Sequence, residues 1–390
     1  MHVVLIQNTE IGGHLALSTF LTWLLAQYPQ THQDRYAVIC GQVLPSPRTT
    51  KIAQMMQIYA MHTSYNVILD NLRFARRAFV TLRRIGHTQP IDVVHCLYPH
   101  SSLLAAVMYK WLVSRRVKII YDVRSPWIRM SLANHHVRQW KRMFVGIMHG
   151  VEYLLVRMID QIVYITQWLA DRYQQTYHLP KTIPVSCIPT GVDVAFWQQA
   201  RDDATVSHIK EELAIPPDRL VIGYIGTISR MRKMEDFFVQ QQQTLLWSKV
   251  VFVLIGDGDG VQELEQVVAT HHLQKHVRLL GKQPQHTLMP YMHVFDRGRC
   301  HLPDIFVFRQ SFPLKILEYL AAGVPILCSK IDAHITLAQE FPSHIQIYDH
   351  HIPFATLQRI PHRQPANIMQ YDWSVLVARY HRIYADLIAS

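Results

Sequence analysis

Short apolar runs rich in β-branched residues recur along the chain, separated by stretches with helical period. In the first half these runs are HVVLIQ (2–7), YAVICG (36–41), DVVHCL (92–97), KIIYDV (118–123), QIVYIT (161–166) and VSCIP (185–189). Each run is continuous rather than alternating, which is typical of strands buried on both faces of a parallel sheet. Residues with helical spacing follow the first and third runs, over 14–28 and 102–116. The pattern therefore predicts a doubly wound α/β fold.

The same rhythm restarts after a polar segment over 198–219. Further buried-strand patterns come at 220–226, 250–256, 277–281 and 325–329. A strongly apolar helix over 314–323 precedes the last of them, and an amphipathic helix closes the chain near 372–390. Two successive Rossmann-like domains, 1–195 and 196–371, are the simplest account of this order, with a hinge near residues 195–215.

The composition is that of a folded protein of a reducing compartment. Of 390 residues, 49% are hydrophobic and 17% are charged, so packed cores can form and disorder is disfavoured. No run reaches the ~18–20 apolar residues of a membrane-spanning helix, and the start lacks a signal-peptide pattern. Five widely spaced cysteines suggest neither a disulfide framework nor a zinc site. We therefore expect a cytoplasmic protein.

The formal net charge of +11 is confined to residues 1–195, because the rest of the chain is balanced. Basic residues concentrate between Arg73 and Arg142, interleaved with aromatic and aliphatic side chains, as in LRFARRAFVTLRRIGH (72–87). On helices this pattern favours contact with an anionic membrane surface, and we expect a peripheral protein of that kind. A basic face that only keeps the protein soluble is the alternative. Nucleic acid is disfavoured because no finger, RNP or basic-zipper signature is present.

Glycines at two strand ends are candidates for phosphate binding. Gly12 and Gly13 follow the first strand and precede a helix, where backbone N–H groups bind phosphate, although a tight βα turn needs glycine as well. Gly226 ends the strand over 220–226, at the sheet edge where ligands of open α/β folds bind. The loop that follows carries three cations suited to a diphosphate: Arg230, Arg232 and Lys233. A solvated loop is the alternative.

The glycine-rich stretch GDGDG (256–260) predicts a turn. Its spacing is not that of a dinucleotide fingerprint, and Asp257 and Asp259 would repel a pyrophosphate.

The segment RQSFPLKILEYLAAGVPILCS (309–329) carries the strongest chemical pattern. Pro313 suits the first position of a helix, and the amides of Leu314 and Lys315 would then face an anion, with the Lys315 ammonium adding charge. Glu318 follows one turn later, where a carboxylate can accept hydrogen bonds from two sugar hydroxyls. The alternative is that Glu318 is an ordinary surface residue of the helix with no ligand.

Taken in order, these segments resemble the GT-B fold glycosyltransferases, and among them the retaining glycosyltransferase family 4. The resemblance covers nearly the whole chain. It rests on the glycine pair at 12–13 and on IDVVHCLYPHSS, DQIVYITQWLADRY, IPTGVDVAFW, VIGYIGTISRMRK, VFVLIGDGDG and FPLKILEYLAAGVPIL. It implies an acceptor domain (1–195) and a donor domain (196–371) facing across a cleft, with the last helix (372–390) crossing back to the first domain.

The resemblance also implies roles for single residues. Glu318 matches the second glutamate of the family's E-x7-E motif, which holds the donor ribose, while Gln310 stands where the first glutamate is expected. Phe312 and Pro313 replace the family's Phe-Gly pair, so that one backbone donor is lost and Lys315 is its substitute.

Two further pairs follow from the resemblance. Arg232 and Lys233 lie near the positions of the basic pair that neutralises the leaving diphosphate. Many members carry a histidine after the strand that corresponds to 118–123, where this chain reads YDVRSPW. Asp122 and Arg124 are therefore candidates for the sugar or acceptor side.

Together these features predict a glycosyltransferase that moves a sugar from a UDP- or GDP-sugar to a saccharide or lipid-linked acceptor with retention of configuration. The resemblance implies that neither a metal nor a cofactor is needed, and it favours a role in surface polysaccharide or glycolipid synthesis. Gln310 and the histidine-rich stretch 334–362 keep open a catalytically silent sugar-nucleotide-binding or assembly protein. An epimerase or phosphorylase on the same fold is a third possibility.

Overall fold

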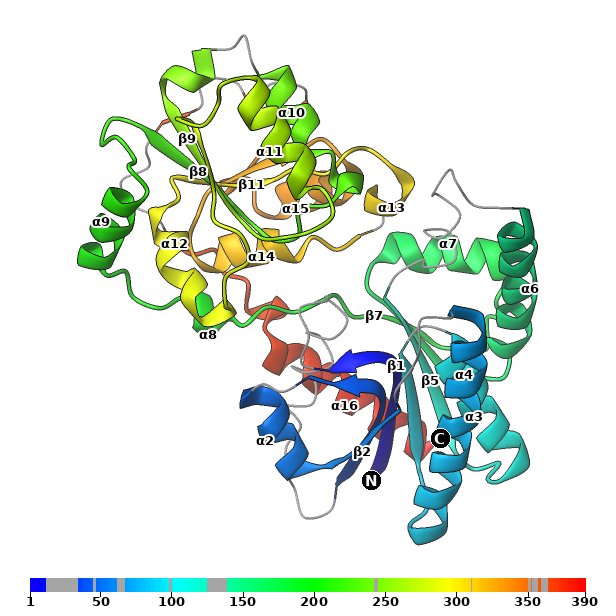
Figure 1. Cartoon of the computed structure of the whole chain (residues 1–390). Helices are drawn as coiled ribbons and strands as arrows, with labels where there is room; N and C mark the ends of the chain where they lie inside the picture. Colours follow the sequence, from blue (N-terminus) through cyan, green and yellow to red (C-terminus); the bar gives the residue numbers. More distant parts are fainter. Residues whose placement is uncertain are drawn as a thin grey trace. The chain divides into compact units, whose positions relative to one another are not determined.

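The chain folds into two compact units. The computed structural model describes residues 1–11, 34–44, 47–61, 67–97, 100–124, 139–241, 245–309, 311–349, 352, 357–358 and 364–390. Unit 1 is Met1–Thr190 together with Trp373–Ser390, and unit 2 is Gly191–Asp372 (Figure 1). The chain therefore leaves unit 1 five residues before the expected boundary at 195/196, and its last helix returns to unit 1.

Unit 1 is built on a parallel sheet of seven strands in the order β3-β2-β1-β4-β5-β6-β7. The strands are β1 (His2–Ile11), β2 (Arg35–Val43), β3 (Gln57–Ala60), β4 (Val93–Leu97), β5 (Lys118–Val123), β6 (Gln161–Tyr164) and β7 (Val185–Cys187). Strands β4, β5 and β6 are buried along almost their full length, as their continuous apolar runs predict.

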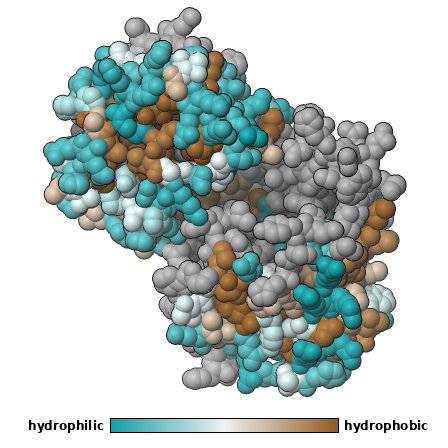
Figure 2. All heavy atoms as spheres, viewed as in Figure 1, coloured by the Kyte–Doolittle hydropathy of each residue, from teal (hydrophilic) through white to brown (hydrophobic). Residues whose placement is uncertain are grey.

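Helices cover both faces of this sheet. They are α2 (Pro47–Met55), α3 (Val67–Thr88), α4 (His100–Leu112), α6 (Gln139–Leu155), α7 (Gln167–Tyr177) and α16 (Trp373–Ala389). Ile52 of α2 and six side chains of α16 share one core cluster with the sheet. Helix α4 packs between α3 and α6, and Figure 2 shows apolar patches between hydrophilic ones on that side of unit 1.

Unit 2 has a second parallel sheet, with six strands in the order β10-β9-β8-β11-β12-β13. Its strands are β8 (Leu220–Ile225), β9 (Val250–Ile255), β10 (Val277–Leu279), β11 (Arg297–Cys300), β12 (Ile326–Ser329) and β13 (Ile345–Tyr348). Its helices are α8 (Val194–Trp197), α9 (Asp203–Glu212), α10 (Met234–Gln240), α11 (Val261–Thr270), α12 (Leu288–Val294), α13 (Phe306–Arg309), α14 (Leu314–Ala321) and α15 (Asp332–Glu340). Short 3-10 turns lie at η1 (Arg230–Arg232), η2 (Leu245–Ser248), η3 (Gln285–Thr287) and η5 (Met369–Tyr371).

The doubly wound parallel fold predicted for both halves is thus confirmed, but the expected hinge at 195–215 is wrong. Those residues form α8 and α9, whose Trp197, Val206 and Ile209 are buried in the core of unit 2. The sequence did not predict that α9 packs on the unit 2 core, because only one face of this helix is apolar and the rest of its surface is polar and charged.

Among the described residues, no helix is both long and apolar enough to span a bilayer.

Candidate functional site

The carboxyl end of the unit 2 sheet gathers most of the residues singled out in the sequence. Strands β8 and β11 are neighbours at the centre of the sheet, and the connections after them run to opposite sides, which makes this edge a topological switch point. The loop after β8 continues into η1, and the loop after β9 carries the glycine-rich stretch. Ligands of open α/β folds bind at such an edge.

The two glycine-rich loops lie backbone against backbone. A Cβ added to Gly256, whose φ is +153°, would lie 1.8 Å from the carbonyl oxygen of Gly226. The Ile228 amide donates to the Asp257 carbonyl at 2.9 Å, and the Gly260 amide donates to the Ile228 carbonyl at 3.1 Å. The glycines at 256–260 therefore allow close packing of the loops, which agrees with the turn predicted for them.

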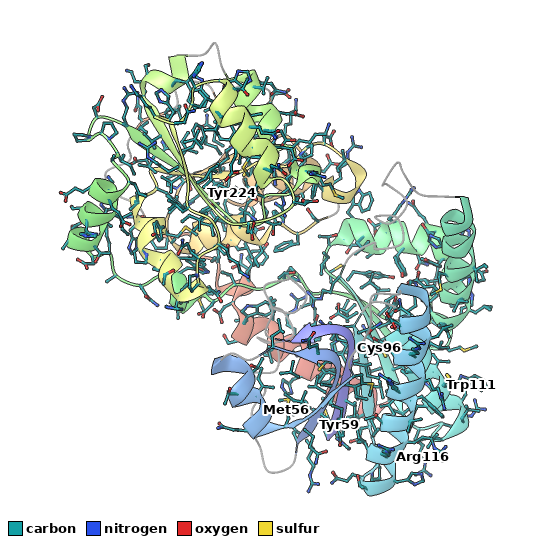
Figure 3. The ribbon with its side chains drawn as sticks, viewed as in Figure 1. Met56, Tyr59, Cys96, Trp111, Arg116 and Tyr224 are labelled. Carbon is teal, nitrogen blue, oxygen red and sulfur yellow. The ribbon has the colours of Figure 1, made fainter. Side chains whose placement is uncertain are left out.

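Lys315 of α14 reaches the end of β8. A Cβ on Gly226, whose φ is +143°, would lie 2.1 Å from the Lys315 Nζ. The same Nζ is 5.0 Å from the ring centroid of Tyr224, which Figure 3 labels within unit 2. Gly226 and Lys315, 89 residues apart in the sequence, are thus brought together. This places a positive charge at the carboxyl end of β8.

Glu318 lies one turn further along α14 and is half-buried. Burial raises the pKa of its carboxyl group to about 7, and the nearby Lys315 ammonium opposes that rise. Within the described part of the chain, the carboxylate has no hydrogen bond or ion pair. A half-buried acid without an internal partner can accept hydrogen bonds from a ligand.

The three cations of the loop after β8 differ in their surroundings. Arg230 Nη2 is 2.5 Å from Glu263 Oε1, and Lys233 Nζ is 3.9 Å from Asp236 Oδ2. Arg232 instead has its Cζ 5.8 Å from the ring centroid of Phe308 and makes no ion pair with the described residues. Of the three, Arg232 is the cation best able to meet an external anion.

The beginning of α14 corrects one expectation. Pro313 is the N-cap rather than the first helical residue, and the Leu314 amide donates to the Phe312 carbonyl at 3.0 Å. The prediction that the Leu314 amide faces an anion is therefore wrong, because that donor is already used. The Lys315 amide has no backbone acceptor among the described residues. The Phe312 ring packs 5.7 Å from that of Tyr371, against the unit 2 core.

Asp122 and Arg124 lie in unit 1, inside a buried polar network. Arg124 Nε is 2.8 Å from Asp122 Oδ1, and the Tyr380 hydroxyl of α16 donates to Asp122 Oδ2 at 2.7 Å. His95 Nε2 donates to Oδ2 at 3.3 Å, and its Nδ1 accepts from the Tyr384 hydroxyl at 2.7 Å.

These contacts also decide the protonation of the pair. Burial works against both charged forms, but Arg124 and then His95 hold the pKa of Asp122 below its ordinary value, while Asp122 raises the pKa of Arg124. Both side chains serve to attach α16 to β5. Their assignment to the sugar or acceptor side stays a prediction that these contacts do not favour.

A second polar cluster in unit 1 was not predicted from the sequence. Glu152 of α6 is buried, and its carboxylate accepts hydrogen bonds from the hydroxyls of Tyr121, Tyr173 and Tyr177. His100 Nε2 lies 2.7 Å from Glu152 Oε2. The cluster joins β5, α4, α6 and α7. No spacing in the sequence pairs these residues, since they meet only through the fold.

Three of the predicted site residues, Gly12, Gly13 and Gln310, lie outside the described residues. Their expected roles stay predictions. Among the residues that the structure covers, no group of three His, Cys, Asp or Glu side chains could hold a metal ion.

Comparison with known proteins agrees with this geometry. The family model described as Glycosyltransferase Family 4 matches residues 22–196, and the one described as Glycosyl transferases group 1 matches residues 219–341. The two models fall on successive halves of the chain, one in each unit apart from the first few residues of unit 2. Both halves of the chain thus match models of glycosyltransferases, and the chain has the GT-B architecture of two parallel-sheet α/β units.

Two curated relatives are similar to this chain over part of its length. N-acetyl-alpha-D-glucosaminyl L-malate synthase of Bacillus anthracis is 19% identical over 251 residues, which are 64% of this chain and 59% of that protein. D-inositol 3-phosphate glycosyltransferase of Corynebacterium jeikeium is 24% identical over 260 residues, which are 60% of this chain and 57% of the relative. The matched part thus spans less than two thirds of either relative.

A solved structure extends the similarity of fold to most of the chain. Anabaena HepE, in a complex with UDP and glucose, superposes with a TM-score of 0.63 and 15% identity, covering 86% of this chain and 83% of HepE.

Proposed function

We propose that this glycosyltransferase moves a sugar from a UDP- or GDP-sugar to a saccharide or lipid-linked acceptor, with retention of anomeric configuration. The observation that carries the proposal is the pairing of Lys315 with Gly226 at the carboxyl end of β8, with the uncommitted Glu318 carboxylate one turn away. A cation and a hydrogen-bond acceptor at a switch point suit a ligand that has both a diphosphate and sugar hydroxyls. HepE, which has the same fold, was solved with UDP and glucose.

The residues have separate roles in this proposal. Lys315 and Arg232 would stabilise the negative charge that develops on the departing diphosphate, which lowers the barrier more than it stabilises the bound donor. Glu318 would accept hydrogen bonds from the ribose hydroxyls and so orient the nucleotide. These side chains can carry the leaving-group charge themselves, so we propose that neither a metal nor a cofactor takes part.

Retention fits a site with one acidic residue. In this reaction the acceptor attacks the face that the leaving group vacates, and an oxygen of the departing phosphate takes the acceptor proton. The proposal therefore needs no paired carboxylates of the kind that retaining hydrolases use. Gln310, which follows the α13 helix in the sequence, would donate to or accept from a sugar hydroxyl but would carry no charge.

The acceptor side is proposed to work at an anionic membrane surface on the cytoplasmic face. Exposed arginines line α3, namely Arg73, Arg76, Arg77, Arg83 and Arg84. Next to them, Leu112 at the end of α4 is 69% exposed, and Trp111 carries the Arg115 guanidinium 3.6 Å from its ring centroid. Figure 3 shows Trp111 and Arg116 at the outer side of unit 1.

The α6 side of the same surface repeats this combination. Ile147, Tyr153 and Leu154 are exposed, and the Arg157 guanidinium lies 3.5 Å from the Tyr153 ring centroid. Exposed apolar side chains beside arginines are typical of proteins that rest on anionic lipid. Such a location suits a lipid-linked acceptor in the synthesis of a surface polysaccharide or glycolipid.

Calorimetric titration with UDP, GDP, ADP and dTDP, without added metal, tests the donor site. We expect one nucleotide to bind the wild type, and Glu318→Ala to lose roughly 1.5 to 3 kcal/mol of binding free energy through loss of charged hydrogen bonds. Glu265→Ala, on the exposed side of α11, is the matched control and should bind as the wild type does.

The outcomes separate the alternatives. If Glu318→Ala binds as tightly as the wild type, Glu318 does not belong to the site. Binding of a nucleotide without sugar transfer to any acceptor extract would favour the catalytically silent binding protein, and interconversion of the nucleotide sugar without an acceptor would favour an epimerase.

A further inference from the structure

Strand β11 carries basic side chains into the interior of unit 2. Arg297 and Arg299 alternate with Gly298 and Cys300, so both arginines lie on one face of the strand, and His301 continues the row. Arg297 is 6% exposed and Arg299 is 0% exposed. Arginine is almost never fully buried unless it is paired, because removing its charge from water is costly. The two buried arginines of this short strand therefore each need hydrogen-bond acceptors or a counter-charge.

Aromatic side chains surround the Arg299 guanidinium. Its Cζ lies 3.6 Å from the ring centroid of Phe237 in α10, and its Nε donates to the Tyr348 hydroxyl at 3.3 Å. The same hydroxyl is 3.0 Å from His301 Nδ1. Burial and the charge of Arg299 together hold the pKa of His301 far below its ordinary value, so this imidazole is neutral. The surroundings thus partly stabilise the cation but contribute no negative charge.

The two terminal nitrogens of Arg299 have no acceptor among the described residues. Nη1 and Nη2 are both buried and make no hydrogen bond, and no described carboxylate forms an ion pair with the guanidinium. Arg297 differs, since its Nη1 and Nη2 donate to the carbonyls of Asp296 and Gln358.

The remaining residues of unit 2 cannot supply a carboxylate either. Those that the structure does not describe are 242–244, 310, 350–351, 353–356 and 359–363, and their sequence contains no Asp or Glu. Within unit 2, the charge of Arg299 is therefore not matched by any acidic side chain.

This arginine is separate from the Lys315 site. Cys300 and Gly298 point to the opposite face of β11, where α14 packs: a Cβ on Gly298 would lie 2.7 Å from the Tyr319 ring. Arg299 points to the face covered by α10, among Phe237, Phe252 and Tyr348. The sheet itself stands between the two positions.

We propose that Arg299 binds an oxyanion of the phosphate class on the α10 face of the unit 2 sheet, through Nη1 and Nη2. The two nitrogens form a planar fork that matches two oxygens of a phosphate, which a single spherical ion cannot do. His301 and Tyr348 stand beside the guanidinium as further hydrogen-bonding groups. The bound anion supplies the missing counter-charge, so binding stabilises unit 2.

Binding of inorganic phosphate in a Lys315→Met background tests this assignment, because that substitution weakens phosphate binding at the other site. We expect isothermal titration of K315M to detect phosphate and its thermal midpoint to rise with phosphate concentration. Adding Arg299→Met should abolish both effects, and adding Arg299→Lys should weaken phosphate binding at least tenfold, since a lysine lacks the fork.

Arg278→Met in the same background is the matched control. Arg278 is a partly buried arginine of unit 2 that donates to the carbonyls of Leu213, Gln274 and Ala214, and its loss should leave phosphate binding unchanged. Equal phosphate binding by K315M and K315M/R299K would overturn the proposal. Chloride bound as tightly as phosphate would show that the oxyanion class is wrong. Nucleotide binding by the wild type is a separate measurement, so failure here leaves the proposed transferase function untouched.

Discussion

Glu318 and Lys315 show how a single helical turn can prepare two opposite charges for one ligand. Lys315 extends to Gly226 and Tyr224, where its ammonium faces the end of β8. Glu318 stays half-buried without an internal partner, so its carboxyl group holds a proton more tightly than usual. A ligand that donates hydrogen bonds to this carboxylate must displace that proton.

The affinity for the nucleotide should therefore increase with pH. With a pKa of about 7, Glu318 is protonated in acid and ionised in base, and donated hydrogen bonds favour the ionised form. By linkage, binding strengthens as pH rises through 7 and levels off above it. Calorimetry between pH 5.5 and about 8.5 measures the slope.

Glu318→Gln is the control for this slope, because it keeps the shape and loses the titration. The phosphate groups of the nucleotide titrate alike in both proteins, so the difference between the two profiles belongs to Glu318. Parallel profiles would mean that the ligand does not contact the ionised carboxylate. The free protein has the opposite trend: a raised carboxyl pKa contributes stability that is complete below 4.5 and is lost as pH rises through about 7.

At the residue scale, the sequence predicted the candidate site residues whose side-chain charge or lack of a side chain matches a known motif. Lys315, Glu318 and Gly226 stand in a motif whose spacing along a strand end and a helix is readable. Tyr224 and Phe237 were not predicted, because an aromatic residue in an apolar run is indistinguishable from ordinary core. Arg299 was not predicted because nothing in the sequence shows that an arginine is buried.

At the scale of elements, the helices of unit 1 determine which surface can meet a membrane. Helix α4 packs between α3 and α6. Helix α3 carries exposed arginines, and Arg115 and Arg157 follow the exposed apolar side chains at the ends of α4 and α6. The sequence predicted amphipathic helices here from the interleaved pattern. It did not predict the contribution of Trp111 and Leu112, whose exposure depends on where α4 ends.

Reversing the charge of α3 should weaken attachment to anionic vesicles. Each basic residue near such a surface contributes about 1 kcal/mol. We expect the combined Arg76→Glu, Arg77→Glu, Arg83→Glu and Arg84→Glu variant to lose most of its co-sedimentation with phosphatidylserine vesicles at physiological salt. Its affinity for free nucleotide should stay that of the wild type, because these residues lie in unit 1.

The matched control reverses four exposed basic residues of unit 2: Arg201, Lys249, Lys275 and Lys330. It changes the net charge by the same amount. If both variants sediment alike, net charge rather than the α3 surface governs attachment, and if neither differs from the wild type, the membrane proposal fails.

Prediction of the elements worked where strands are uniformly apolar and failed where they are not. The runs at 118–123 and 250–256 became β5 and β9 with almost the predicted bounds. Strand β11 was missed because its sequence is RGRC, and β13 because it lies in the histidine-rich stretch taken as irregular. Both strands form by pairing with β12. Such pairing joins residues far apart in the sequence, so the local sequence does not predict it.

For the whole molecule, the decisive feature is that unit 1 is made of two separate pieces of chain. Helix α16 contributes Trp373, Leu376, Tyr380 and Tyr384 to the unit 1 core. Its two tyrosines also reach the polar network of Asp122, in which the carboxylate is both buried and ionised. Helix α16 is thus held by apolar packing along its length and by hydrogen bonds at one buried acid.

Tyr380→Phe should therefore loosen α16. Loss of the hydroxyl removes a donor from Asp122 and should cost about 1 to 3 kcal/mol, measured as faster native-state hydrogen exchange of the α16 amides. Tyr59→Phe, which removes an exposed hydroxyl that donates to Gln57, is the control and should cost less than about 0.5 kcal/mol. Equal effects of the two substitutions would contradict a special role for the network.

The pH dependence of this contact follows from the depressed pKa of Asp122. The ionised carboxylate stabilises unit 1 at every pH above its unfolded pKa of 3.8, and that contribution is lost as pH falls through the lower folded value. The advantage of the wild type over Tyr380→Phe should accordingly persist from neutral pH down to about 4 and shrink only in stronger acid.

The order of the domains was readable from the sequence, but their exact limits were not. The polar segment after 195 looks like a linker because α9 shows only one narrow apolar face to the core. The true crossings, at Thr190–Gly191 and Asp372–Trp373, lie shortly after β7 and directly before α16 rather than where the composition changes.

The split of unit 1 has a consequence for synthesis on the ribosome. The residues of unit 2 form one uninterrupted stretch and can fold as soon as they have left the exit tunnel. The first 190 residues emerge earlier yet lack part of their hydrophobic core until α16 is translated. During that interval the α16-binding side of the first sheet is exposed to solvent and to chaperones, so the part of the protein that is made first is the last to be completed.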